Sequence, residues 1–331
     1  MKKGSTKSEW NKEINSILVT KNYQKQKSMS SLITIPTIAK LHQLLGLPSP
    51  SHPLISVFNF DDIQIEPDST LNAMVTDFYI IALKKDCAGG IFRYGQSEYE
   101  YNEGVMYFTA PKQILQFNNI LLEKVRGFVL AIHPDFLYSY QLSSKIKDFN
   151  YFSYSSNEAL FIFEKEEKPI LGIIENIAKE INSNLDSFTQ DLLISNIELI
   201  LKYCDRFYNR QFLTRKKENF ELLTKFEEIL EESFKEEMLL SHGIPTVKSI
   251  STKLNITANY LSDMLRVQTG LTTQQYIQNK LLDKAKILLS TTNLSVSEIA
   301  YKLGFEHAQS FHRLFRKQND ISPLEFRNSF N

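Results

Sequence analysis

Residues Ile299 to Arg327 read IAYKLGFEHAQSFHRLFRKQNDISPLEFR, and this stretch decides the fold of the C-terminal part of the chain. Its pattern predicts a short helix that ends near Lys302, a turn at Gly304 and a second helix from about His307 to Lys317. Two helices joined by a short turn that contains glycine are typical of a helix-turn-helix, whose second helix enters the major groove of DNA. We therefore predict a DNA-reading unit here.

The predicted second helix has one apolar face and several polar faces. Phe311, Leu314 and Phe315 fall at positions i, i+3 and i+4, so they form one stripe that faces a small core. The other faces carry Gln309, His312, Arg313 and Arg316. Packing alone does not explain these residue types at this spacing.

A second copy of the pattern lies upstream, between Ser249 and Gly270. Residues Tyr260 to Arg266 align with Ser310 to Arg316 at an offset of 50, whereas the residues before the turn align at an offset of 49. The C-terminal copy therefore has one extra residue in its turn. Asn255 takes the place of glycine in the upstream turn, and asparagine is among the residues that best tolerate a positive φ.

Residues 246–331 resemble the DNA-binding domain of AraC/XylS-type transcription regulators. The features that carry the resemblance are two helix-turn-helix motifs, a joining helix, the turn Leu303-Gly304-Phe305 and a closing segment from Ser322 to Arg327. Asp320 departs from the family pattern, which usually has glycine at this position. Since aspartate can also enter the left-handed region, the turn is still expected to form.

The joining helix, predicted from about Thr273 to Leu289, is expected to fix the spacing of motifs at about 247–267 and 296–317. At about 1.5 Å per residue it spans roughly 25 Å. That length suits a strut between two helices in successive major grooves, which lie about 34 Å apart on one face of a duplex. One chain is expected to read two adjacent groove segments, and a dimer a repeated site.

The predicted DNA contacts fall into phosphate contacts and base contacts. The N-cap candidates Thr257 and Ser295 would place backbone N–H groups on phosphates, and Arg316 and Lys317 would meet phosphates as cations. The resemblance implies base-reading positions on the exposed faces of the recognition helices: Asn259, Ser262, Asp263, His307, Gln309, Ser310 and Arg313. An ordinary solvated helix face is the alternative for each of them. Because Asp263 stands where a basic residue would favour DNA, the first motif is expected to bind more weakly.

The net charge of zero conceals an asymmetry between the two parts of the chain. Residues 246–331 contain 11 Lys and Arg against 6 Asp and Glu, which leaves 27 against 32 for the rest. The C-terminal part alone therefore has the positive charge expected of a phosphate-binding domain.

Length and composition indicate a globular protein of two or more domains, because the chain has 331 residues of which 42% are apolar. No run approaches the roughly 18 apolar residues of a membrane span, so we expect a cytoplasmic protein. Cys87 and Cys204 are far apart and are expected to be reduced thiols.

The N-terminal part is expected to contain a leader and a β-rich domain. Residues 1–28 are rich in Lys, Ser, Asn and Gln and predict a flexible leader. Residues 29–165 begin with a short helical piece that ends at Gly46, and apolar runs separated by turns follow. These runs are Ile55 to Phe60, Met74 to Leu83, Ile91 to Tyr94, Val105 to Phe108 and Phe128 to Ile132. We expect an α+β protein of two domains whose N-terminal domain is a small antiparallel β-barrel or sandwich. The family resemblance, carried here by Gly104 to Pro111, implies a cupin-like regulatory domain.

Residues 166–214 are predicted to be helical and to pack on this domain. One stripe runs from Ile170 to Ile181 and a second from Leu192 to Phe207. Their surplus apolar surface either pairs two protomers, as the resemblance implies, or completes a layer within one chain. Residues 215–245 predict a charged linker helix that stops at Gly243.

No cofactor or metal is predicted. A metal-dependent cupin enzyme needs converging histidine and carboxylate ligands, whereas only His133 and His52 lie near predicted strands. His133 is expected to be a structural residue where a strand ends.

The leading interpretation is a sequence-specific transcription regulator, an activator, whose N-terminal domain binds a small-molecule effector or mediates dimerisation. Its expected partners are double-stranded DNA, a second copy of the chain and, for an activator, RNA polymerase. Two alternatives stay open: a constitutive DNA-binding protein whose barrel is only an assembly platform, and a cupin-type enzyme with an attached DNA-binding module.

Overall fold

The protein divides into two compact units, each described below by itself. The first comprises Met1–Gly90, Tyr101–Asp148 and Ile162–Ile200, and the second comprises Ile91–Glu100, Phe149–Phe161 and Leu201–Asn331. The computed structural model describes residues 32–64, 73–85, 91–94, 97–100, 104–116, 125–155, 158–183, 186–214 and 216–329. The predicted leader at 1–28, Cys87 and the glycines at 89, 90 and 95 lie outside these ranges.

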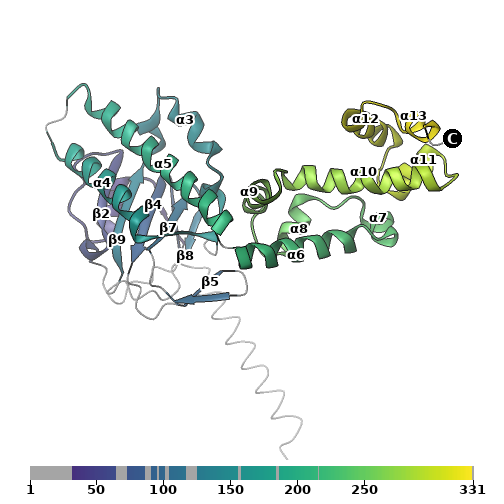
Figure 1. The fold of residues 1–331 in the computed structure, drawn as a ribbon. Coiled ribbons are helices and arrows are strands. Elements are labelled where there is room, and N and C mark those ends of the chain that lie inside the picture. Colours follow the sequence, from purple (N-terminus) through teal and green to yellow (C-terminus); the bar gives the residue numbers. More distant parts are fainter. Residues whose placement is uncertain are drawn as a thin grey trace, which may run out of the picture. The chain divides into compact units, whose positions relative to one another are not determined.

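A five-stranded sheet forms the centre of the first unit (Figure 1). Its strand order is β10-β7-β4-β9-β2, with bounds Leu160–Ile162, Gly104–Thr109, Tyr79–Lys85, Arg126–Ile132 and Ile55–Asn59. Strand β4 pairs antiparallel with both neighbours and places Ile81 opposite Phe108 and Leu130. All residues of β4 from Tyr79 to Leu83 are buried, so both faces of the sheet are covered.

A smaller sheet and a helix cover one side of the core. Strand β1 (Leu32–Ile35) runs parallel to β3 (Ala73–Thr76), which pairs antiparallel with β8 (Ile114–Gln116). Helix α2 (Ile38–Leu44) follows β1 and is capped by Thr37, and Gly46 takes a positive φ of 66° just after it. One apolar cluster joins these elements to the large sheet and includes Ile38, Leu41, Phe58, Phe78, Ile80 and Val129.

Helices cover other apolar surface of the first unit. Helix α4 (Glu164–Ile181) packs against β2. The predicted stripe from Ile170 to Ile181 is confirmed, because Ile170, Ile173, Ile174, Ile177 and Ile181 are all buried. Helix α5 (Thr189–Thr214) buries most of its predicted stripe, but Leu192 is 50% exposed.

The expected antiparallel barrel is wrong for the described residues. The large sheet has two edge strands, β10 and β2, and the small sheet contains the parallel pair β1–β3. The physical reason is that strand pairings such as β1 with β3 join residues far apart in the chain, while the apolar run of β4, buried on both faces, does not distinguish an open sheet from a barrel wall. Two predicted runs also divide differently: Leu32 to Ile35 is a strand, and the run from Met74 to Leu83 breaks at Asp77 and Phe78.

His133 lies where strand β9 ends, as predicted, and a short 3-10 helix follows it. His133 caps the turn Pro134–Leu137, and its Nδ1 accepts from the Asp135 N–H at 3.3 Å. His52 Nδ1 likewise accepts from the Leu54 N–H at 3.1 Å. Both imidazoles therefore have local structural partners. Among the described residues, no group of three or more His, Cys, Asp and Glu could hold a metal ion.

The described part of the second unit is helical apart from Leu160 and Phe161 of β10 and the antiparallel pair β5 (Ile91–Tyr94) and β6 (Ser97–Glu100). It contains a short 3-10 helix, η5 (Asn150–Ser153), and the C-terminal part of α5. The remaining helices are α6 (Lys216–Ser233), α7 (Glu236–His242), α8 (Val247–Lys253), α9 (Ala258–Thr269), α10 (Thr273–Thr291), α11 (Val296–Lys302), α12 (Ala308–Asn319) and α13 (Pro323–Asn328). The predicted linker helix is thus two helices, because the chain breaks after Ser233 and stops again at Gly243, where φ is 71°. Cys204 on α5 is buried and is in no disulfide among the described residues.

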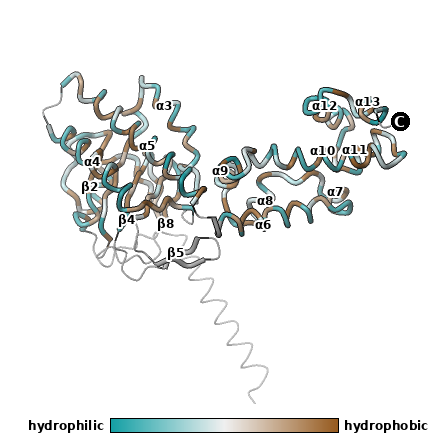
Figure 2. The backbone as a smooth tube through the Cα atoms, viewed as in Figure 1, coloured by the Kyte–Doolittle hydropathy of each residue, from teal (hydrophilic) through white to brown (hydrophobic). Residues whose placement is uncertain are grey.

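The distribution of hydropathy differs between the strands of the first unit and the helices. Figure 2 shows hydrophobic residues concentrated along strands of the first unit, whereas the helices alternate hydrophobic and hydrophilic residues along their length. No helix within the described ranges combines the length and the apolar character that crossing a bilayer requires.

Candidate DNA-binding site

Two helix-turn-helix motifs form the candidate site, α8–α9 and α11–α12, and α10 joins them. Both turns begin with the same hydrogen bonds. After α8, the N–H groups of Asn255 and Ile256 donate to the carbonyls of Thr252 and Ser251; after α11, those of Gly304 and Phe305 donate to Tyr301 and Ala300. This is the Schellman arrangement, which needs a left-handed residue just after the helix. Asn255 (φ 56°) and Gly304 (φ 81°) supply it, so the predicted equivalence of these two positions is confirmed.

The recognition helices end alike as well. Gly270 and Asp320 adopt left-handed conformations at the ends of α9 and α12, and their N–H groups donate to Arg266 and Arg316 at 2.9 Å. Asp320 therefore takes the role that glycine has in the first copy. Capping boxes start the helices that follow: Thr272 with Gln275 at α10, and Ser322 with Glu325 at α13. The internal repeat thus extends into the next helix.

Aromatic rings hold α12 in place. Phe311 and Phe315 are fully buried, and Phe315 contacts the rings of Phe311 and Phe326 at centroid distances of 5.7 and 5.5 Å. Phe305 from the turn lies 5.4 Å from Phe311. Burial of the stripe fixes which side of α12 faces outward, because residues three and four apart share a face.

The predicted reading face of α12 is open to solvent. His307, Gln309, Arg313, Arg316 and Lys317 are exposed, and Ser310 is half-buried. This face therefore combines side chains that can hydrogen-bond base edges with cations that suit phosphates. Ser295 caps α11. Its Oγ accepts from the Glu298 N–H at 3.2 Å, and the Glu298 carboxylate accepts from the Ser295 N–H at 2.7 Å. This capping box uses donors that were predicted to face phosphate.

The predicted reading face of α9 is occupied, unlike that of α12. Thr257 caps α9, and its N–H and Oγ1 donate to the Glu158 carboxylate at 2.5 and 2.9 Å. Asn259 Nδ2 donates to Ser153 Oγ at 2.8 Å. Ser262 Oγ lies 3.1 Å from Thr273 Oγ1 on α10. These three residues, like Asp263 described next, thus have partners within the protein that the sequence did not predict.

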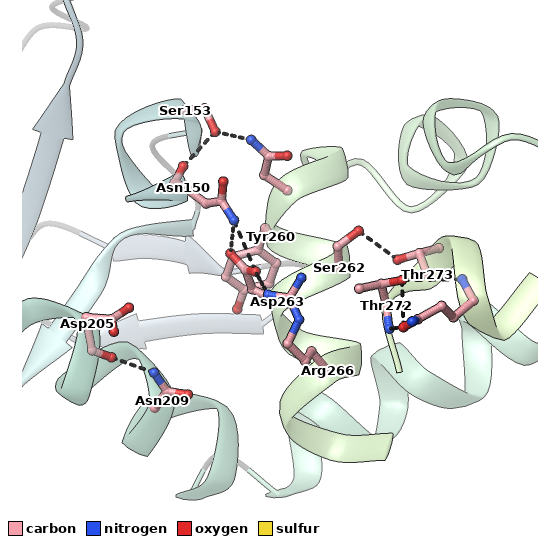
Figure 3. A network of polar contacts seen from close by, with 12 residues as sticks. Asn150, Ser153, Asp205, Asn209, Tyr260, Ser262, Asp263, Arg266, Thr272 and Thr273 are labelled. Carbon is pink, nitrogen blue, oxygen red and sulfur yellow. Dashed lines mark hydrogen bonds and ion pairs between the residues drawn. The ribbon is translucent and has the colours of Figure 1, made fainter. Parts of the chain in front are cut away.

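Asp263 has the most partners of these residues. Its carboxylate accepts from Asn150 Nδ2 at 2.9 and 3.1 Å and from the Tyr154 hydroxyl at 2.7 Å. Arg266, one turn further along α9, donates to it at 2.9 Å (Figure 3). Because all of these contacts neutralise or satisfy the carboxylate, Asp263 is suited to a protein contact.

Burial changes the protonation of these groups. It raises the pKa of Glu158, against the hydrogen bonds from Thr257 and Ser155, which lower it. Burial also raises the pKa of the Tyr154 hydroxyl well above 10.0, with a further contribution from the nearby Asp263 carboxylate. Tyr154 therefore stays neutral at physiological pH and can donate its hydrogen bond to Asp263.

The sequence did not reveal Asn150, Ser153, Tyr154 and Glu158 as partners of α9. They lie about 100 residues before it in the chain, and no periodicity or spacing reports a contact over that separation. The one available signal was Asp263 itself, an acidic residue at the position that Arg313 takes in the second copy.

Comparison with known proteins supports the interpretation of these motifs. Residues 250–329 match the family described as "Helix-turn-helix domain". The chain is 40% identical over 80 residues to the HTH-type transcriptional activator RhaS of Citrobacter koseri. Residues 250–329 form an AraC-type helix-turn-helix domain.

These similarities extend over only part of each chain. The match to RhaS covers 24% of this chain and 29% of RhaS. A second relative, the uncharacterized HTH-type transcriptional regulator YijO of Escherichia coli K12, is 34% identical over 85 residues, or 26% of this chain and 30% of YijO. The chain thus spans less than a third of the length of these relatives.

Solved structures are similar over about a third of this chain. The C-terminal domain of the two-component response regulator yesN from Fusobacterium nucleatum is 35% identical, with a TM-score of 0.27, and the match covers 31% of this chain and 93% of that domain. The DNA-binding domain of AdpA, solved in complex with a target DNA, is 23% identical, with a TM-score of 0.28 over 32% of this chain and 91% of that domain.

Proposed function

We propose that this protein is a sequence-specific DNA-binding transcription regulator. The observation that supports the proposal is the exposed polar and cationic face of α12, held outward by the buried Phe311 and Phe315. Arg313 lies on this face and bonds guanine O6 and N7, while Gln309 suits adenine. Arg316 and Lys317, in the last turn, contact phosphates.

The two motifs give the protein a site of two parts. Helix α10 has 19 residues and is therefore about 28 Å long, at about 1.5 Å per residue. It places the two recognition helices in adjacent major-groove segments, about 34 Å apart. The second motif supplies most of the sequence preference, because the first presents Asp263 where the second presents Arg313.

We also propose that the regulator is an activator whose N-terminal part controls it through an effector or through dimerisation. The activator assignment rests on the printed name of RhaS, a transcriptional activator, and makes RNA polymerase a partner. Dimerisation is supported by α5, which exposes Leu192 and Leu199, seven residues apart, to 50% and 44%. Two such side chains on one helical face suit a second copy of the helix. Double-stranded DNA and a second copy of the chain are thus the proposed macromolecular partners.

The decisive experiment uses the full chain and Arg313→Ala. A duplex selected by the wild-type protein from a random pool is titrated in a mobility-shift assay. We expect Arg313→Ala to weaken specific binding by about 1–3 kcal/mol, or about 5- to 140-fold in Kd, and to relax the preference at one base pair. Arg316→Ala should instead weaken binding to all duplexes and flatten its salt dependence, because it removes a phosphate contact.

Lys179→Ala is the matched control, since it removes one exposed cation from α4 in the first unit. It should leave affinity and preference unchanged. A wild-type protein that selects no duplex sequence at moderate salt would refute the proposed function. An Arg313→Ala protein with wild-type affinity and preference would refute only the role of Arg313.

A further inference from the structure

Asn150, Ser153, Tyr154 and Glu158 contact the face of α9 that would meet DNA; we refer to these four residues as the clamp. We propose that the clamp holds the first helix-turn-helix in a state that cannot bind DNA, with the Glu158 carboxylate in the place of a DNA phosphate. This inference rests on the proposed function. It adds a competitor for the DNA-binding face that lies within the same chain.

The first argument is the chemistry at the start of α9. The Glu158 side chain is 1% exposed and accepts from the Thr257 N–H, the Thr257 hydroxyl and the Ser155 N–H at 2.5, 2.9 and 2.7 Å. Burial of a carboxylate is costly unless hydrogen bonds satisfy it, and these three donors do so. The N-terminus of a helix favours any anion, whether carboxylate or phosphate. While Glu158 is bound, a phosphate cannot use the same Thr257 donors.

The second argument is that the clamp also covers positions predicted to read bases. Ser153 accepts from Asn259, and Asn150 and Tyr154 donate to Asp263. The Tyr154 ring packs edge-on against Tyr260, with centroids 5.2 Å apart, and so fixes the clamp to the buried side of α9 as well. The clamp thus already engages polar groups of Asn259 and Asp263 that would have to bond base edges.

The third argument is the contrast between the two motifs. Positions 257, 259 and 263 correspond to His307, Gln309 and Arg313, which are all exposed. The repeat therefore carries side chains suited to DNA where its surface is open. Where the clamp lies, it carries Asp263, a side chain that repels phosphate and accepts two donors of the clamp. The contacts of Asp263 with the clamp thus explain why an acidic residue, which is unfavourable for DNA binding, occupies this position.

The consequence is a regulated affinity. If the clamp is closed in most molecules, the apparent Kd exceeds the intrinsic Kd by the inverse of the open fraction. Any event that withdraws the clamp residues from α9 would strengthen binding without a change in the residues that touch DNA.

The test compares full-length proteins on one duplex that carries a site for each motif, by fluorescence anisotropy. Glu158→Gln keeps the shape of the side chain and removes its charge, and Tyr154→Phe keeps the ring and removes the donor to Asp263. Because the Gln amide presents an N–H2 donor where one carboxylate oxygen accepts, it leaves a donor of Thr257 or Ser155 unpaired, and we expect Glu158→Gln to lower the Kd by about 10- to 100-fold. Tyr154→Phe should act in the same direction. Asp148→Asn, an exposed residue of the first unit, controls for the loss of one negative charge and should keep the wild-type Kd.

Hydrogen exchange at the amides from Thr257 to Tyr260 shows directly whether the clamp has opened. Faster exchange in Glu158→Gln together with a wild-type Kd would overturn the inference. If exchange is unchanged, the triple variant Asn150→Ala, Tyr154→Phe, Glu158→Gln is used, and a wild-type Kd for that protein would also overturn it. If no protein in the series prefers any duplex sequence, the proposed function fails instead.

Discussion

Gly304→Ala should destabilise the second unit more than Gly270→Ala, although both glycines have left-handed conformations. Their φ values are 81° and 76°. A Cβ at Gly270 would meet nothing within 4 Å, whereas one at Gly304 would lie 3.1 Å from the Leu239 carbonyl oxygen and 3.2 Å from two backbone atoms of Gly243 and Ile244. The two substitutions therefore share the backbone strain and differ in crowding.

The magnitude follows from these two contributions. A left-handed conformation costs an L-residue about 1–2 kcal/mol, and loss of freedom in the unfolded chain offsets about 0.4–1 kcal/mol. Gly270→Ala should therefore cost about 0.5–1.5 kcal/mol. Crowding against backbone that cannot rotate away adds about 1–3 kcal/mol at Gly304, for a total of about 2–4 kcal/mol.

Calorimetry of the full chain measures this difference. For a unit of about 150 residues, each kcal/mol shifts the Tm by about 2–4 °C. We expect decreases of roughly 4–16 °C for Gly304→Ala and roughly 1–6 °C for Gly270→Ala in the transition of the second unit. Gly172→Ala, in α4 with no atom within 4 Å of the added Cβ, is the control and should leave that transition in place. Equal decreases for the two left-handed glycines would refute the argument, because they would mean that α7 does not restrict the turn.

Two further outcomes are expected. Leu199→Glu should convert a dimer to a monomer in sedimentation equilibrium, because it places a charge on the exposed apolar face of α5. The control Leu240→Glu, on α7 where the leucine is 62% exposed, should leave the dimer intact. A wild-type protein that is a monomer would contradict the proposed dimer. The ratio of the wild-type Kd to that of Glu158→Gln should rise as the pH is lowered toward 4.5, since burial raises the pKa of Glu158 in the clamp above that ordinary value. Between the ordinary pKa and the raised pKa, the clamped carboxyl group binds more protons than the released one, so acid favours the clamped state. Above the raised pKa, the ratio of the two Kd values should not change with pH. A ratio that falls with acid would contradict this assignment.

The C-terminal helices could be predicted from the sequence because their determinants are local. Apolar residues at i, i+3 and i+4 set the buried face of α12, and Gly304 and Asn255 mark turns whose hydrogen bonds span only a few residues. The internal repeat added a second, independent indication. The DNA contacts themselves remain predictions, since exposure shows that a side chain is available and not what it binds.

The N-terminal architecture could be predicted only in part. Runs of Ile, Val, Phe and Tyr indicated strands, but the run from Tyr79 to Leu83 is equally compatible with a barrel wall and with a sheet buried on both faces. Which layers cover a sheet depends on pairings such as Leu32 with Ala73, between residues that are distant in the chain. The contact of Glu158 with Thr257 escaped prediction for the same reason.

The length of α10 sets a rotation as well as a distance. A helix turns by about 100° for each residue, so adding or removing one residue within its 19 would swing α11, α12 and α13 by more than a quarter of a circle about its axis while moving them only about 1.5 Å. The two recognition helices would then point in different directions from one side of the molecule. Changes of about seven residues restore the angle, because they add close to two whole turns. The rotation that α10 imposes between the two motifs, more than its length, therefore limits how the spacing between the two half-sites can vary among proteins with this pair of motifs.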